Sequence, residues 1–360
     1  MDVRSSAPRR PFITTERGSK MSKKKYDFSI VMGRFEPFHL GHNDLCDAAE
    51  KVADQTIILT GSANQARTPK DPFTAKERRE MIAGNRPNAI ILPMRDFYYS
   101  DENWVGQVQE IVEKTVMPGS EIVLVGHVKD ASSYYLRKFP QWDFINRQPT
   151  RNLSATDVRN ILFAGRPFQK LEFSFKGMVP DHTNEYLQEW TRAHCEEFEQ
   201  LKEEHTYYLE YPKLWGQGPH ITTDALVICG GCVLLVRRAD CPGKGLWALP
   251  GGFLGLNERI EAGTIRELKE ETSIDCPAKV LTGSIVKRET FDHPYRSLRG
   301  RVITHCSRID LQDIGLPKVK AASDAKLAEW KTIAWCKANP QLFFEDHYHI
   351  FESMTSGGYK

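Results

Sequence analysis

The chain contains the run Gly252-Phe-Leu-Gly-Leu-Asn-Glu-Arg-Ile-Glu-Ala-Gly-Thr-Ile-Arg-Glu-Leu-Lys-Glu-Glu-Thr-Ser-Ile274, which crowds acidic side chains onto one predicted helix. Glu267, Glu270 and Glu271 share a face of that helix, because residues three and four positions apart are neighbours on its surface. Three carboxylates so placed repel one another unless a cation lies among them, and hard oxygen ligands suit Mg²⁺ or Mn²⁺. The run therefore predicts a divalent-metal site, with a solvated acidic helix face as the alternative.

The residues that flank these glutamates follow a characteristic order. Gly252 is followed after five residues by Glu258, and after seven more by Arg266, which opens the sequence Arg-Glu-Leu-Lys-Glu-Glu. This order resembles the Nudix box of nucleoside-diphosphate-X hydrolases. One position departs from the family pattern, since Ser273 stands where Gly is usual near the helix end. The departure affects the exit from the helix rather than the metal ligands, so activity is still expected.

The resemblance to the Nudix box implies a role for each of its residues. Glu267, Glu270 and Glu271 are the expected metal ligands, and Glu267 and Glu271 are the expected catalytic groups. Supporting roles fall to Gly252, Glu258 and Arg266, because an arginine can orient neighbouring carboxylates through bidentate ion pairs. The implied chemistry is attack of a metal-activated water on a pyrophosphate.

Length and composition narrow the class of protein. A chain of 360 residues is long enough for two domains, and its net charge of +2 gives no electrostatic case for a nucleic-acid partner. Its apolar runs are too short to cross a membrane. The eight cysteines are scattered, which favours a reducing cytoplasm over a disulfide scaffold. Residues 1–25 are expected to form a disordered basic arm.

The cysteine pair in Cys229-Gly-Gly-Cys232 has the spacing of a redox or metal motif. The pair lies between two apolar runs, and no second pair follows at zinc-finger spacing. A β-hairpin turn with two incidental thiols is therefore the favoured interpretation, and a redox or metal role is the alternative.

The first half alternates strand and helix patterns, which predicts an α/β domain at residues 26–175 with a Rossmann-like, doubly wound parallel sheet. The expected strands are Phe28–Met32, Thr56–Thr60, Ala89–Pro93, Glu121–Val125 and Phe144–Ile145, and the expected helices are Leu40–Val52, Thr74–Gly84, Trp104–Lys114, Ser132–Lys138 and Ala155–Phe163. Ligands of such sheets bind beyond the carboxyl ends of the strands.

Beyond this domain the pattern changes. Residues 176–217 are expected to be a linker region with one connecting helix, Asn184–Glu204. Residues 218–352 are expected to form an α/β/α Nudix fold with a mixed sheet. Its expected strands are Asp224–Ile228, Cys232–Arg237, Val280–Arg288 and Gly300–Ser307.

A second candidate site follows the first expected strand, in Gly33-Arg-Phe-Glu-Pro-Phe-His-Leu-Gly-His42. The N-terminus of a helix attracts anions, because its free N–H groups and its dipole point outward. His39 and His42 are three residues apart at such a helix start and can each donate an N–H to a phosphate oxygen. Gly41 between them is expected to let a nucleotide approach closely. Two ordinary surface or capping histidines are the alternative.

A further element supports the phosphate interpretation. The sequence Ser154-Ala-Thr-Asp-Val-Arg159 offers hydroxyls at a predicted helix start and an arginine one turn later. Together the two elements resemble the HxGH nucleotidyltransferase superfamily. Further motifs, over about residues 26–165, are similar to archaeal-type nicotinamide mononucleotide (NMN) adenylyltransferases: Gly61-Ser-Ala-Asn64, Lys70-Asp-Pro-Phe-Thr74, Glu77-Arg78, and Asp96 with Trp104-Val105.

This resemblance implies residue roles in joining NMN to ATP, with release of pyrophosphate. His39, His42 and Arg159 are the expected catalytic groups at the ATP phosphates. Further nucleotide and phosphate contacts are expected from Gly33, Arg34, Phe35, Gly41, Lys70, Ser154 and Thr156, with Arg67 as a weaker candidate. Trp104 is expected to stack on the nicotinamide ring, with a core aromatic as the alternative, and Asp96 is expected nearby. The segment between Asp96 and Trp104 is a residue longer than the family leads us to expect.

The two halves together resemble the bacterial bifunctional NMN adenylyltransferase/Nudix hydrolases. In that family the Nudix half cleaves ADP-ribose to AMP and ribose 5-phosphate. Arg296 and Arg299 are candidates to grip a phosphate and Tyr295 to stack on adenine, although a solvated basic hairpin explains the arginines equally well. Glu289 and Glu329 are alternative catalytic bases.

The expected partners are small-molecule nucleotides: ATP as a substrate, NMN, NAD and ADP-ribose, with Mg²⁺ or Mn²⁺ as cofactor. No nucleic acid or membrane is expected, and homo-oligomer formation is left open. Alternatives are an adenylyltransferase for another acceptor, a Nudix half that acts on another dinucleotide, and a non-catalytic sensor of ADP-ribose.

Overall fold

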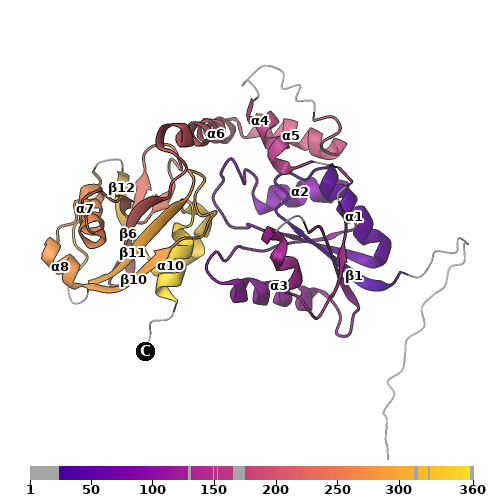
Figure 1. Cartoon of the computed structure of the whole chain (residues 1–360), viewed down its shortest axis with the longest axis horizontal. Coiled ribbons are helices and arrows are strands. Elements are labelled where there is room, and N and C mark those ends of the chain that lie inside the picture. The colour runs from indigo at the N-terminus through magenta and orange to yellow at the C-terminus, as the bar shows by residue number, and fades with distance from the viewer. Residues whose placement is uncertain are drawn as a thin grey trace, which may run out of the picture.

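The protein folds into two α/β halves, seen side by side in the computed structural model (Figure 1). The structure describes residues 24–128, 131–148, 150–151, 153–164, 175–311, 315–322 and 325–356. All but two residues of the expected N-terminal arm lie outside these ranges. Within them, no helix combines the length and the apolar character needed to span a membrane.

The first half contains a five-stranded parallel sheet with strand order β3-β2-β1-β4-β5, as the alternating pattern predicted. Its strands are β1 Tyr26–Gly33, β2 Ala53–Thr60, β3 Ile90–Pro93, β4 Ile122–Gly126 and β5 Asp143–Asn146; its helices are α1 Leu40–Val52, α2 Ala75–Asn85, α3 Asp101–Thr115, the 3₁₀ helix η1 Ala131–Arg137 and α4 Ala155–Ala164. Helices cover both faces, so the central strands are buried on both sides; Ile30 and Val31, adjacent in β1, are both fully buried. The carboxyl ends of β1, β2 and β4 meet at one edge of this sheet.

The connecting region differs from the prediction of one helix. The chain forms α5 (Asp181–Ala193) and α6 (Cys195–Trp215), and His194 between them has φ −119° and ψ 45°, outside the helical region. The break lets α5 pack on α2 while α6 runs across to the second half (Figure 1). Glu77 of α2 accepts a hydrogen bond from Trp190 Nε1 at 2.9 Å, which holds α5 in place. No Gly or Pro marks the break, so the sequence pattern did not reveal it.

The second half contains a seven-stranded mixed sheet, as predicted. Its main strand order is β10-β11-β6-β7-β12, with β8 beside β7 and β9 beside β6; only β11 and β6 run parallel. The strands are β6 His220–Cys229, β7 Cys232–Arg238, β8 Trp247–Ala248, β9 Gly251–Phe253, β10 Ile285–Phe291, β11 Val302–Leu311 and β12 Ala325–Thr332; the helices are α7 Ile260–Thr272, α8 Ala278–Gly283, α9 Ile333–Ala338, the 3₁₀ helix η2 Pro340–Leu342 and α10 His347–Thr355.

Two local predictions in this half have opposite outcomes. The expected strand Val280–Arg288 is wrong in its first part, because α8 occupies Ala278–Gly283 and β10 starts only at Ile285. Pro277 at the N-cap favours a helix start there, and Leu281 is fully buried from it. The hairpin at Cys229–Cys232 is confirmed: these residues pair across it, and both central glycines have positive φ. All eight cysteines lie within the described residues, and none of them forms a disulfide bond.

Ser273, the departure from the Nudix pattern, ends α7 in the left-handed region, with φ 43° and ψ 36°. An L-residue with a Cβ is strained in that region by about 1–2 kcal/mol, whereas Gly is not. After allowance for the greater freedom of Gly in the unfolded chain, we expect Ser273→Gly to raise the free energy of unfolding by about 0.5–1 kcal/mol. Urea denaturation measures this change. Ser273→Ala keeps the strained Cβ and is the control, so equal stabilisation by both variants would contradict the explanation.

Candidate active sites

The two histidines of the first site cap helix α1, and the side chain of each accepts a hydrogen bond from the backbone N–H of the other. His39 is the N-cap residue, and its Nδ1 accepts the N–H groups of Gly41 at 3.1 Å and His42 at 3.3 Å. His42 Nδ1 in turn accepts the N–H of His39 at 3.3 Å. A neutral imidazole that accepts at Nδ1 carries its proton on Nε2, so each ring has an Nε2–H donor. Both histidines therefore cap the helix through Nδ1, as the alternative expected. The same hydrogen bonds fix the tautomer with the proton on Nε2, which is the one that can donate to a phosphate.

The small and aromatic residues of this motif position the histidine rings. The rings of His39 and His42 stack with centroids 3.6 Å apart. A Cβ on Gly41 would lie 3.0 Å from Cε1 of His39, so glycine here makes room for that ring. Phe35 is buried, and its ring centroid lies 4.7 Å from that of His42. A Cβ on Gly33 would lie 3.2 Å from the Phe35 ring. Phe35 and the two glycines therefore support the site through packing.

The second phosphate element lies against the first in space. Ser154 and Asp157 cap the start of α4: the Ser154 hydroxyl donates to the Asp157 carboxylate at 2.8 Å. Arg159 is buried and donates to the carbonyl of Glu36 at 2.6 Å and to the hydroxyl of Thr156 at 3.1 Å. Because Glu36 belongs to the loop that leads into α1, Arg159 fastens the starts of α1 and α4 together. The two motifs quoted from the sequence therefore form one region.

A cavity of about 760 Å³ opens beside this region, at the carboxyl ends of the first sheet's strands. Five of the predicted residues line it: Gly33, Arg34, Lys70, Asp96 and Trp104. The remaining predicted residues of this half, His39, His42, Gly41, Phe35, Ser154, Thr156 and Arg159, are not part of its lining. The cavity is therefore lined by both cationic and aromatic side chains.

The cations of the cavity are held by carboxylates. Arg34 lies 3.2 Å from Asp71 and its side chain is about half exposed. Burial lowers the pKa of Lys70, and the neighbouring Arg34 lowers it further, while Asp71 and Asp96 oppose the shift. A bound phosphate would relieve the repulsion between these two cations. Arg67 is committed elsewhere, since it forms a bidentate ion pair with Glu77 at 2.6 and 2.7 Å.

Asp96 and Trp104 also line this cavity. Asp96 accepts hydrogen bonds from the Ser62 hydroxyl at 2.7 Å and the Ser62 N–H at 3.2 Å, so it fixes a loop at the cavity edge. Trp104 contacts Tyr135 edge to face, with centroids 5.8 Å apart, and still lines the cavity. Both the core and the ligand-facing interpretations of this tryptophan therefore fit its position.

Arg78 is a functional-site residue that sequence reasoning quoted only as part of a motif. Its side chain is fully buried, lies 2.9 Å from the carboxylate of Glu36, and donates to the carbonyls of Arg34 at 2.7 Å and Ser62 at 3.2 Å. It therefore ties together two loops that line the cavity. A charged residue in a helix such as α2 gives no sign in the sequence that it points inward.

In the second half, Arg266 gathers the carboxylates of the Nudix motif. Its guanidinium donates to Glu258 at 2.8 and 2.9 Å, to Glu267 at 2.8 Å and to Glu270 at 2.8 Å. These hydrogen bonds, with one from the N–H of Gly255, lower the pKa of Glu258 to about 2. Among the described residues, no three His, Cys, Asp or Glu side chains are grouped as metal ligands. Arg266 draws Glu267 and Glu270 toward itself in this arrangement.

The donor set nevertheless fits a divalent cation. Glu267, Glu270 and Glu271 lie on α7 at the predicted spacing, and α7 packs against β9. A Cβ on Gly252 would lie 2.7 Å from the carboxylate of Glu267, so glycine is needed for the carboxylate to approach the strand. Glu271 is buried and its Oε2 accepts the N–H of Gly251 at 2.9 Å. Carboxylates brought to one strand in this way are the oxygen ligands that Mg²⁺ and Mn²⁺ take.

A cavity of about 120 Å³ adjoins this motif. Four predicted residues line it: Gly252, Glu271, Arg296 and Arg299. Arg296 is held by Asp346 at 2.7 and 2.9 Å, and Arg299 by Glu345 at 3.0 Å. The arginines are thus fixed by carboxylates and are not the solvated basic hairpin of the alternative.

The other residues predicted for this half do not line that cavity: Glu258, Arg266, Glu267 and Glu270 belong to the acidic motif beside it, and Tyr295, Glu289 and Glu329 lie elsewhere. Tyr295 lines the cavity of the first half instead. Glu289 lies 2.9 Å from Lys287, Glu329 pairs with Lys331, and neither lines the smaller cavity. Sequence reasoning missed Asp224 and Arg238, which do line it. Asp224 lies inside a buried strand. A carboxylate in an otherwise apolar strand indicates a specific role, and the hydrophobic pattern alone does not reveal it.

Comparison with known proteins finds a family match for each half of the chain. The NUDIX domain family matches residues 218–353, and the cytidylyltransferase-like family matches residues 30–161. A nicotinamide/nicotinic acid mononucleotide adenylyltransferase of Acinetobacter baylyi is 35% identical over 148 residues, which are 39% of this chain and 78% of that protein. An ADP-ribose pyrophosphatase of Methanocaldococcus jannaschii is 36% identical over 134 residues, 37% of this chain and 72% of that protein.

One kind of solved structure spans both halves. A bifunctional NMN adenylyltransferase/ADP ribose pyrophosphatase from Francisella tularensis is 34% identical, with a TM-score of 0.85, and the match covers 92% of this chain and 99% of that one. A second crystal structure of such a protein from the same organism, complexed with AMP and Mn ion, has a TM-score of 0.82 at 33% identity, over 91% of this chain and 98% of that one. The chain therefore belongs to the family of bifunctional NMN adenylyltransferase/ADP-ribose pyrophosphatases.

Proposed function

We propose that this enzyme carries out two reactions of NAD metabolism at two separate sites. The first half transfers the adenylyl group of ATP to NMN and releases pyrophosphate. The second half hydrolyses ADP-ribose to AMP and ribose 5-phosphate. The observation that carries the first assignment is the pair of Nε2–H donors at the start of α1, fastened by Arg159 to the start of α4.

In the first reaction the NMN phosphate attacks the α-phosphorus of ATP in line, and no covalent enzyme intermediate is needed. His39, His42 and Arg159 donate to the departing pyrophosphate and neutralise its developing charge. Arg34 and Lys70 hold phosphates inside the larger cavity, and Trp104 offers its ring to the nicotinamide. Fixed donors suit this chemistry, because they need no rearrangement when charge develops.

In the second reaction the carboxylates of Glu267, Glu270 and Glu271 hold the divalent cation, Mg²⁺ or Mn²⁺. The cation, when bound, supplies Lewis-acid activation of water and of the pyrophosphate. Arg266 keeps Glu258 ionised and orients both Glu258 and Glu267, and Arg296 and Arg299 line the pocket beside them. The metal preference and these residue roles are part of the proposal, which draws on the Francisella tularensis structure with Mn ion.

Incubation of the full-length protein with defined substrates tests both assignments. ATP, NMN and Mg²⁺ should give NAD and pyrophosphate, and ADP-ribose should give AMP and ribose 5-phosphate in the same preparation. Adenylylation of only another acceptor, such as FMN or phosphopantetheine, would refute the first assignment. Tight binding of ADP-ribose without turnover at any metal concentration would favour a sensor over a hydrolase.

The cellular setting follows from the same chemistry. We place the enzyme in the cytoplasm, where eight cysteines that form no disulfide stay reduced. Its partners are the small nucleotides ATP, NMN, NAD and ADP-ribose, and its net charge of +2 gives no reason to invoke nucleic acid.

A further inference from the structure

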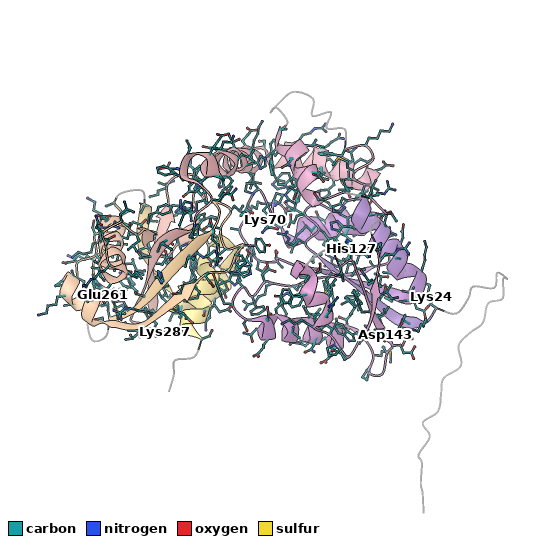
Figure 2. The ribbon with its side chains drawn as sticks, in the orientation of Figure 1. Lys24, Lys70, His127, Asp143, Glu261 and Lys287 are labelled. Carbon is teal, nitrogen blue, oxygen red and sulfur yellow. The ribbon has the colours of Figure 1, made fainter. Side chains whose placement is uncertain are left out.

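The second half of the protein contributes residues to the cavity of the first half. The segment 292–301, which links β10 and β11, carries His293 and Tyr295 to the wall of the 760 Å³ cavity. Lys70, from the opposite side of that cavity, is drawn between the two halves in Figure 2, and its Nζ lies 5.4 Å from the centroid of the Tyr295 ring. The two halves therefore share one wall of this cavity.

The segment is held against the first half by aromatic contacts. The ring of His293 stacks on that of Tyr98, with centroids 4.8 Å apart and planes 12° apart. Tyr98 also contacts His349 of α10, with centroids 4.6 Å apart. These contacts use the segment that follows Asp96. That segment contains the tyrosine on which the second half docks.

A buried ion pair fixes the base of the same segment. Arg296 is buried against Asp346, and the Asp346 carboxylate also accepts the hydroxyl of Tyr99. On the α10 side of this contact, Arg95 pairs with Glu352 at 2.7 Å. Paired charges that are removed from water hold a fixed geometry, because a shift would leave a buried charge unpaired. His293 and Tyr295 are therefore presented to the cavity on an anchored segment.

The groups presented to the cavity suit a nucleotide base. The Tyr295 side chain is 62% exposed, so its ring remains open to contact. His293 Nδ1 accepts the N–H of Tyr295 at 3.3 Å, which leaves the proton of the neutral ring on Nε2 as a donor. Burial lowers the pKa of His293, so the ring is uncharged at neutral pH. An uncharged donor beside an exposed ring does not repel the cationic nicotinamide.

The rest of the cavity decides which substrate these residues meet. Trp104 and Asp96 line it together with His293 and Tyr295, and Arg34 and Lys70 supply charge for a phosphate. Aromatic rings and cations that line one cavity fit a mononucleotide, which offers a base to stack and a phosphate to pair. We propose that His293 and Tyr295 position NMN for adenylyl transfer, so that the adenylyltransferase site is complete only when the second half is docked.

Substitutions in the full-length enzyme test this inference, which rests on the adenylyltransferase function proposed above. We expect Tyr295→Ala and His293→Ala each to raise KM for NMN about three- to tenfold, the usual effect of losing one aromatic contact. KM for ATP and for ADP-ribose should stay within twofold of the wild-type values. A general structural defect would change the KM of all three substrates and not that of NMN alone. Tyr295→Phe keeps the ring and is the matched control, with an expected KM close to that of the wild type.

Each outcome bears on a different statement. A raised KM for ADP-ribose with an unchanged KM for NMN would overturn the inference and return Tyr295 to the second site, as the sequence suggested. A change in KM for ATP alone would mean that His293 and Tyr295 contact ATP and not NMN, and it would overturn the inference. If the wild type makes NAD and all three variants retain its KM for NMN, the inference fails while the proposed function stands. If the wild type makes no NAD, the proposed function fails first.

Discussion

Glu271→Gln is expected to lower the rate of ADP-ribose hydrolysis about 10²–10³-fold and to leave NAD synthesis nearly unchanged. A neutral amide binds a divalent cation far more weakly than a carboxylate does, so several kcal/mol of the stabilisation that the metal gives the transition state are lost. Glu271 is buried beside Gly251, and its Oε2 accepts that residue's N–H at 2.9 Å. The amide oxygen of Gln can accept the same hydrogen bond, so the fold should persist. Initial rates of AMP release and of NAD formation, measured on one preparation, give the comparison.

The matched variant for this prediction is Glu270→Gln. Glu270 is about half exposed and pairs with Arg266, so the substitution removes a proposed metal ligand without disturbing a buried contact. Both variants should lose hydrolysis and bind Mn²⁺ more weakly, with unchanged thermal unfolding in metal-free buffer. Parallel loss of NAD synthesis in either variant would contradict the separation of the two sites.

His42→Ala is expected to have the reverse effect. Removal of the Nε2–H donor should lower NAD synthesis about 10²–10³-fold, the usual result of losing one donor to developing charge. ADP-ribose hydrolysis should continue at the wild-type rate, because the acidic motif lies in the other half. His42 also accepts the N–H of His39 at 3.3 Å, so the variant loses part of a helix cap. That loss is expected to lower stability by about 0.5–2 kcal/mol.

His42→Asn separates the two roles of this residue. The Asn side chain places an acceptor near the position of Nδ1 and so keeps the cap, but it does not reach the position of Nε2. We expect this variant to regain the stability lost in His42→Ala while NAD synthesis stays low. Recovery of both stability and synthesis would mean that His42 acts through the helix alone. Thermal unfolding and NAD formation are the two measurements.

Local patterns in the sequence predicted the two motifs around which the sites are proposed. The Nudix glutamates and the two histidines lie within one or two turns of a single helix, so their spacing alone fixes their relation. The parallel sheet of the first half followed from the alternation of strands and helices in the same way. The structure added reasons that spacing does not show, such as the space that Gly41 leaves for the ring of His39.

Other features were hidden because local patterns do not encode them. The break at His194 has no Gly or Pro to mark it and depends on contacts between α5 and α2. The helix α8 replaced part of an expected strand because a short apolar run fits either element. Arg78 was quoted only for its motif, since a charged residue is ordinarily exposed and its burial depends on carbonyls from two distant loops.

The sequence by itself determined the two chemistries, because each depends on side chains that one helix start or one helix face brings together. Only the tertiary structure decided how the halves meet. His293 and Tyr295 belong by sequence to the second half, yet they line the cavity of the first. The path of that segment is set by contacts with Tyr98, Tyr99 and Asp346, which come from both halves of the chain. Such contacts join residues far apart in the chain, and no periodicity or motif in the sequence records them.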